Sequence, residues 1–132
     1  MKPFALVAAL AVLPGAEAAA QDARVGAAIY RSHCATCHGI EARGGGPMAE
    51  ILAIDTPGLT GLAAANGGEF PLLRVMRQID GRDPMLAHGG VMPLFGDYFE
   101  GNTVAVQGPG GQPILTSQAI ADLTAWLAMI QD

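Results

Sequence analysis

The two cysteines of this chain lie three positions apart, in the segment Cys34-Ala35-Thr36-Cys37-His38. The sequence has no third cysteine, so a disulfide framework or a four-cysteine metal site is excluded. A histidine follows the second thiol directly and adds an imidazole to the same turn. This spacing constrains the fold most, because the remaining elements have to be arranged around whatever these three side chains hold.

Two cysteines separated by two residues and followed by histidine form the attachment sequence for c-type haem. The thiols add across the porphyrin vinyl groups as thioethers, and the imidazole of His38 coordinates the iron. A thioredoxin-like dithiol would need a preceding strand and a βαβ pattern, and a zinc site would have only His33 and His88 to add. A structural disulfide between Cys34 and Cys37 stays open. We expect one covalently attached haem c.

The composition agrees with a fold built around a cofactor. With 51% hydrophobic and 14% charged residues the chain is not a disordered tail protein, and 132 residues provide one compact domain. Aromatic residues make up only 5%, whereas there are 18 glycines and nine prolines. The side chains alone would form a thin core, so we expect a bound group to fill the interior.

Residues 1–20 have the three-part pattern of a secretory signal peptide. Lys2 provides the positive start, an apolar run follows that is too short to span a bilayer, and small residues provide a cleavage site after Ala18 or Ala20. We therefore expect export to the periplasm and a mature domain of residues 21–132.

Hydrophobic periodicity predicts three helices in the mature chain, at about 23–34, 71–80 and 118–130, and a short extra helix at 47–53. The caps expected for the three helices are Asp22 at the start of the first, Gly81 at the end of the second, and Thr116 or Ser117 at the start of the last.

Gly26 lies in the middle of the first predicted helix. Glycine costs about 1 kcal/mol there relative to alanine. We interpret it as the site of a close helix crossing, against Trp126 or Leu123 of the last helix.

A small β-hairpin is predicted before the last helix. Thr103–Gln107 and Gln112–Leu115 flank a glycine-rich turn at 108–111, and Pro113 limits the second arm to a sheet edge. The role of this 98–115 segment stays open: it could shield one side of a bound group, form a docking surface, or be a passive loop.

The order of these motifs resembles a class I c-type cytochrome over essentially the whole mature chain. The motifs that carry the resemblance are, in order, Gly26 and Tyr30, Cys34-Ala35-Thr36-Cys37-His38-Gly39, Ile79-Asp80-Gly81, Met92-Pro93-Leu94-Phe95-Gly96, and Asp122-Leu123-Thr124-Ala125-Trp126-Leu127. The resemblance implies an all-α cytochrome c fold, with three to four helices around one covalently bound haem and the hairpin as an insertion.

The resemblance also implies the roles of the site residues. Cys34 and Cys37 hold the porphyrin, His38 is the proximal iron ligand, and Met92 is the distal ligand. Met92 is favoured because Pro93 follows it, as in the ligand loop of the family.

Two residues of the same loop, Met85 and His88, remain alternatives to Met92 as sixth ligand. Met76 and Met129 are interpreted as helix core instead. His33 is expected to be a solvent-exposed helix residue.

The family resemblance also suggests what surrounds the haem. His38 should donate its other ring nitrogen to a backbone carbonyl in the Gly44–Pro47 loop. Arg74, Arg77 and Arg82 form the nearest cationic cluster for the haem propionates.

With both axial positions occupied by protein, the expected function is periplasmic one-electron transfer, and the chain is a carrier, not an enzyme. The partners would be transient redox proteins, one donor and one acceptor. A net charge of −5 argues against nucleic acid, and no membrane span remains after signal cleavage. Two alternatives stay open: a haem subunit permanently docked to a periplasmic oxidoreductase, and a catalytic or gas-sensing haem with an open site.

Overall fold

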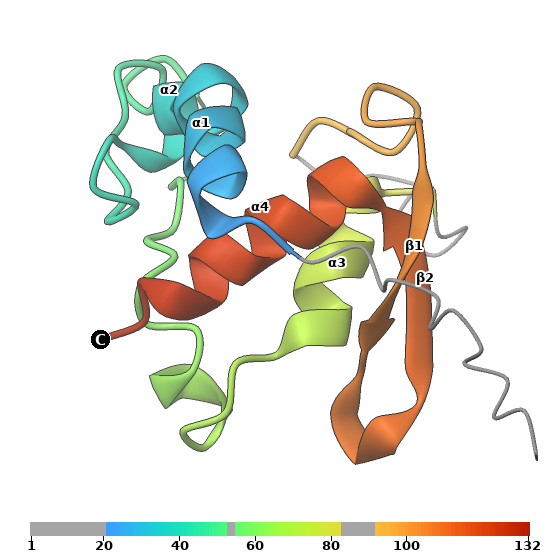
Figure 1. Ribbon diagram of the computed structural model, residues 1–132. Helices are drawn as coiled ribbons and strands as arrows, with labels where there is room; N and C mark the ends of the chain where they lie inside the picture. Colours follow the sequence, from blue (N-terminus) through green and yellow to red (C-terminus); the bar gives the residue numbers. More distant parts are fainter. Residues whose placement is uncertain (1–20, 53–54, 83–91) are drawn as a thin grey trace, which may run out of the picture.

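The computed structural model describes residues 21–52, 55–82 and 92–132. The predicted signal peptide, Met85 and His88 lie outside the described residues. The elements, in chain order, are α1 (Ala23–His33), α2 (Ala35–His38), η1 (Ala64–Asn66), α3 (Leu72–Asp80), β1 (Thr103–Gln107), η2 (Pro109–Gly111), β2 (Pro113–Ser117) and α4 (Gln118–Met129). Figure 1 shows α4 running through the middle of the molecule, with α1 on one side and α3 on the other.

The crossing of α1 and α4 is the closest helix contact, and glycine makes it possible. A Cβ atom at Gly26 would overlap the carbonyl oxygen of Asp122 and would lie 2.9 Å from the Cβ of Trp126. Next to this gap the rings of Tyr30 and Trp126 pack with centroids 4.4 Å apart. The predicted role of Gly26 at a helix crossing is confirmed.

The helix ends follow local sequence signals. The Asp22 carboxylate accepts a hydrogen bond from the backbone N–H of Arg24 at the start of α1, and the Ser117 hydroxyl accepts one from Ile120 at the start of α4. Gly81, with a φ of 68°, ends α3 in the left-handed conformation. For the three main helices, each predicted boundary lies within one residue of the observed one.

The short helix predicted at 47–53 was wrong over its described part, which forms a turn. The N–H groups of Ile51 and Leu52 both point to the carbonyl of Met48, each at 3.2 Å. The Met48 N–H bonds to the carbonyl of Thr36. This bond attaches the start of the segment to the cysteine motif. The residues that follow Met48 form a single turn.

The predicted hairpin is confirmed and continues directly into α4. β1 and β2 pair antiparallel, with Val106 opposite Ile114 and Val104 opposite Thr116. Val104 and Val106 are buried, and both strands pack against α4. β2 extends to Ser117, beyond the predicted end at Leu115. Ser117 is also the cap of α4, so the strand runs into the helix without a connecting loop. In the part of the chain that the structure describes, no helix combines the length and the apolar sequence that crossing a membrane requires.

Candidate functional site

One cavity brings the four predicted site residues together. It has a volume of about 470 Å³, within the range of small-molecule and cofactor sites, and its lining includes Cys34, Cys37, His38 and Met92. Most of the remaining lining is apolar and comes from α3, α4 and the segments before and after α3; it includes Leu59, Leu62, Val75, Ile79, Leu123 and Leu127. The fold therefore places a mostly apolar cavity directly beside the cysteine motif.

Backbone hydrogen bonds hold the cysteine motif in place. The N–H groups of Gly44, Gly46 and Met48 donate to the carbonyls of His38, Cys37 and Thr36, at 2.8, 3.0 and 2.9 Å. A Cβ atom at Gly46 would lie 2.5 Å from the carbonyl oxygen of Thr36, so only glycine permits this approach. The glycine-rich loop is thus a support for the motif.

The imidazole of His38 is buried and oriented by one hydrogen bond. Its Nδ1 lies 2.9 Å from the carbonyl oxygen of Pro57. Because a carbonyl only accepts, Nδ1 carries the proton, and Nε2 of the neutral ring keeps its lone pair for a metal.

The acceptor for His38 was predicted in the Gly44–Pro47 loop, and that prediction was wrong. The loop contacts the motif through its own N–H groups, which donate to the backbone carbonyls of the motif. A Cβ atom at Gly44 would lie 2.7 Å from the carbonyl oxygen of Thr56. The loop therefore supports the segment that carries Pro57, and Pro57 supplies the acceptor.

Cys34 and Cys37 do not resemble a reactive redox pair. No disulfide joins Cys34 and Cys37. Burial raises the pKa of the Cys34 thiol to about 11, with a smaller contribution from Cys37. Thioredoxin-like motifs depend on a lowered thiol pKa, so this environment is the opposite of theirs. Among the described residues there is also no group of three or more His, Cys, Asp or Glu side chains that could hold a metal ion.

Besides the two histidines and Tyr30, the lining includes three polar side chains, Thr56, Arg74 and Gln78. The hydroxyl oxygen of Thr56 is buried and has no hydrogen-bond partner among the described residues, which is costly unless a bound group supplies one. The two carboxylates of haem c are such acceptors. The thiols, the imidazole, the apolar wall and this unpaired hydroxyl together fit a haem.

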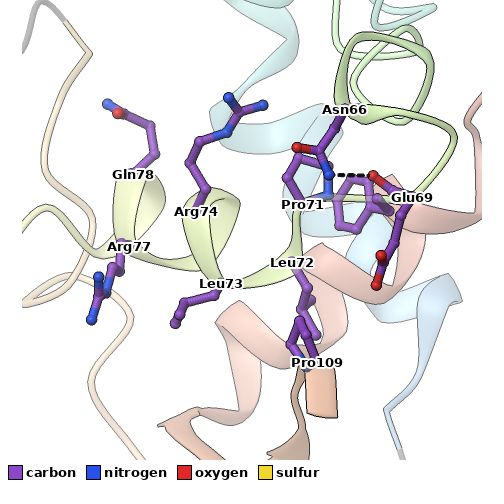
Figure 2. A pocket seen from close by; sticks show the side chains of 10 residues that line it. Asn66, Glu69, Pro71, Leu72, Leu73, Arg74, Arg77, Gln78 and Pro109 are labelled. Atoms are coloured by element: carbon purple, nitrogen blue, oxygen red, sulfur yellow. Dashed lines mark hydrogen bonds between the residues drawn. The ribbon is translucent and has the colours of Figure 1, made fainter.

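Of the predicted arginine cluster, only Arg74 lines the cavity in the described structure. Arg82 forms an ion pair with Asp80 at 2.8 Å. Arg77 lines a second hollow of about 560 Å³, which opens more widely to solvent and shares Arg74 and Gln78 with the first. Figure 2 shows this second hollow, with Arg74 and Gln78 projecting to one side of α3 and Arg77 to another.

Met92, which lines the same cavity, is half-buried, whereas Pro93 and Leu94 are exposed. Met76 is buried as predicted, but Met129 is 66% exposed, so its interpretation as helix core was wrong. Met129 follows the last buried position of α4, Leu127, and faces away from the core.

His33 was predicted to be exposed, and this was also wrong. It is half-buried, lines the cavity, and packs against the rings of Tyr98 and Phe99 at centroid distances of 5.0 and 5.5 Å, with Phe95 at 6.4 Å. The sequence did contain a signal: three of the few aromatic residues occur within residues 95–99.

The family model described as Cytochrome c matches residues 23–131, which include the cysteine motif, Pro57, Met92 and all of the described helices. The chain belongs to the cytochrome c family. The predicted fold class is confirmed: the described residues form four α-helices and a two-stranded sheet before the last of them. Cytochrome c domains bind covalently attached haem c and use it in electron transfer, so the cofactor prediction is confirmed as well. No curated protein and no solved structure matches the chain.

Proposed function

We propose that this cytochrome is an exported one-electron carrier of the periplasm. Its haem would be attached through Cys34 and Cys37 and ligated by His38 and Met92. The observation that carries the proposal is that these four side chains line a single cavity, although Met92 is far from the other three in sequence.

The protein's part in the reaction is to hold both ligands ready. The hydrogen bond from His38 Nδ1 to the carbonyl of Pro57 fixes the orientation of the ring and leaves Nε2 as the nitrogen that would bind the iron. Met92, which lines the same cavity, would offer its thioether as the second ligand. The haem supplies reversible one-electron chemistry at its iron.

The lining also influences the reduction potential of the haem. Apolar side chains such as Leu123 and Leu127 exclude water and disfavour the additional charge of the oxidised centre. A methionine thioether favours the reduced state as well. We therefore expect a relatively high potential, a quinol-linked or dehydrogenase donor, and small, short-lived contacts with donor and acceptor.

Export is supported by the signal pattern in residues 1–20 and by the family, whose members are typically exported. The alternative is a haem subunit that stays docked to a periplasmic oxidoreductase. Size-exclusion chromatography of a native periplasmic fraction separates the two: a lone small haem protein supports the carrier, and co-migration with a larger enzyme supports the subunit.

The ligand set is tested by absorption spectra of the wild type, Met92→Ala and Met129→Ala, each produced with haem-maturation machinery. Met129 is the matched control because it is exposed on α4 and does not line the cavity. We expect the weak far-red sulfur-to-iron band in the ferric wild type and in Met129→Ala, and its loss in Met92→Ala. A band that persists in Met92→Ala would contradict the assignment and favour Met85.

A further inference from the structure

The chain leaves α3 at Gly81 and returns to the same helix end shortly after Met92. The N–H of Phe95 donates to the carbonyl of Ile79 at 3.0 Å, and the N–H of Gly96 donates to the carbonyl of Asp80 at 2.9 Å. Two consecutive backbone hydrogen bonds therefore join the segment after Met92 to the last turn of α3.

Two glycines allow this contact to be unusually close. A Cβ atom at Gly96 would lie 2.5 Å from Nε of Arg82 and 2.7 Å from Oδ1 of Asp80. A Cβ atom at Gly81 would overlap the side chain of Leu94. The side chains of Asp80 and Arg82 thus lie directly on the backbone of the returning segment.

Arg82 links this helix end to the turn that follows. Its Nε and Nη2 donate to the two carboxylate oxygens of Asp80, both at 2.8 Å, in a bidentate pair. Its Nη1 reaches Glu100 Oε1 at 3.4 Å and lies 3.9 Å from Asp97 Oδ1. One guanidinium therefore contacts both sides of the junction.

The molecule contains a second aspartate-arginine pair with the same spacing. Arg24 donates to Asp22 at the start of α1, at 3.0 Å between Nη2 and Oδ2, and its side chain is 93% exposed. Among the described residues, the hydrogen bonds and the ion pair of the Arg24 side chain are all with Asp22. It is a matched control for the loss of one arginine charge.

We propose that Arg82 is a positioning residue: it fixes the segment after Met92 on the end of α3 and so holds the methionine sulfur at the cavity. The inference rests on the proposed role of Met92 as a ligand. When these contacts of Arg82, here called the clamp, are weakened, the segment after Met92 separates from α3 more often. The sixth coordination position of the haem iron then becomes accessible to an external ligand.

The test compares ferric holoprotein of the wild type, Arg82→Gln, Arg82→Lys and Arg24→Gln. The probe is imidazole at about pH 8, where it is neutral and insensitive to the lost charge. Its binding rate is followed as loss of the far-red band. We expect binding about five times faster in Arg82→Gln, an intermediate rate in Arg82→Lys, which keeps the charge but not the bidentate geometry, and an unchanged rate in Arg24→Gln.

Amide hydrogen exchange at Phe95 and Gly96 provides a second readout that needs no iron ligand. Both amides should exchange faster in Arg82→Gln and at the wild-type rate in Arg24→Gln. Equal imidazole rates in the two glutamine variants, with unchanged exchange at both amides, would overturn the proposal. If the wild type has no far-red band, the methionine ligand is refuted, and the exchange rates alone decide for or against the clamp.

Discussion

The two sides of the cavity are built in different ways. On the His38 side, a continuous stretch from Cys34 to Met48 supports itself through successive backbone hydrogen bonds, and the Tyr30 hydroxyl adds a bond to Gly39 at 2.6 Å. On the Met92 side, no backbone hydrogen bond between described residues involves Met92, Pro93 or Leu94. That side depends on the contact of the following residues with α3.

This difference indicates how each ligand is held. The cysteine motif is held by many backbone hydrogen bonds, most of them within the stretch from Cys34 to Met48, so we expect it to open rarely. The methionine side is closed by contacts between residues distant in sequence, and regions with few internal hydrogen bonds open at a lower free-energy cost. We expect the histidine side to determine whether holoprotein forms, and the methionine side to determine its reactivity.

Substituting each proposed ligand in turn should reveal the largest difference between the two sides. We expect His38→Ala to lower the yield of haem-stained protein more than about tenfold, because both attachment and ligation depend on this turn. Met92→Ala should keep its covalent haem and most of its yield. Haem staining of denaturing gels at equal expression measures both. Equal losses in the two variants would contradict the asymmetry.

A single methyl group should weaken the histidine side without touching a ligand. Gly46→Ala places a Cβ atom against the carbonyls of Thr36 and Ala35, so we expect it to destabilise the protein by about 2 kcal/mol. Gly61→Ala is the control, because a Cβ atom at Gly61 would meet no atom within 4 Å. Urea unfolding of the two holoproteins gives the difference, and similar midpoints would disprove the supporting role of the loop.

Arg74 lines the cavity that would hold the haem. Removing its positive charge should favour the oxidised state, so we expect Arg74→Gln to lower the potential by roughly 20–40 mV. Arg24→Gln changes the net charge equally at a distant, exposed site and should shift the potential less. Redox titration measures both, and equal shifts would mean that Arg74 acts only through the net charge.

The smallest expected effect is a pH dependence on the methionine side. The hydrogen bond from Arg82 holds the pKa of Asp80 below its usual value of 3.8. A lowered carboxyl pKa contributes stability that is complete above the usual value and is lost as pH falls through the lowered one.

The free energy of unfolding of the wild type should therefore approach that of Asp80→Asn as the pH decreases from about 6 to about 3. Because the pair is partly solvated, the change should stay near 0.5 kcal/mol. Denaturant unfolding at several pH values tests this. A difference in unfolding free energy between the two proteins that grows toward low pH would contradict the prediction.

The sequence predicted what depends on local patterns. The spacing of Cys34, Cys37 and His38, the caps of the helices, and the unusual position of Gly26 are all readable from a few neighbouring residues. These features identified the fold class, the cofactor and one side of the cavity.

The features that were missed depend on pairing between distant segments. Pro57, whose carbonyl orients His38, lies in a segment without any distinguishing pattern. The packing of His33 against residues 95–99 and the clamp at Arg82 exist only because the chain returns to α1 and α3 after Met92. Neither periodicity nor motif spacing indicates where such a return ends.

We propose that His38 and Met92 hold one haem between them. The most direct test is NMR of the ferrous holoprotein with methyl-labelled methionine, because a thioether bound to haem iron lies in the ring current of the porphyrin. We predict one methionine methyl resonance shifted far upfield in the wild type and in Met129→Ala, and its absence in Met92→Ala. A wild type without such a resonance, or a Met92→Ala variant that retains it, would contradict the account.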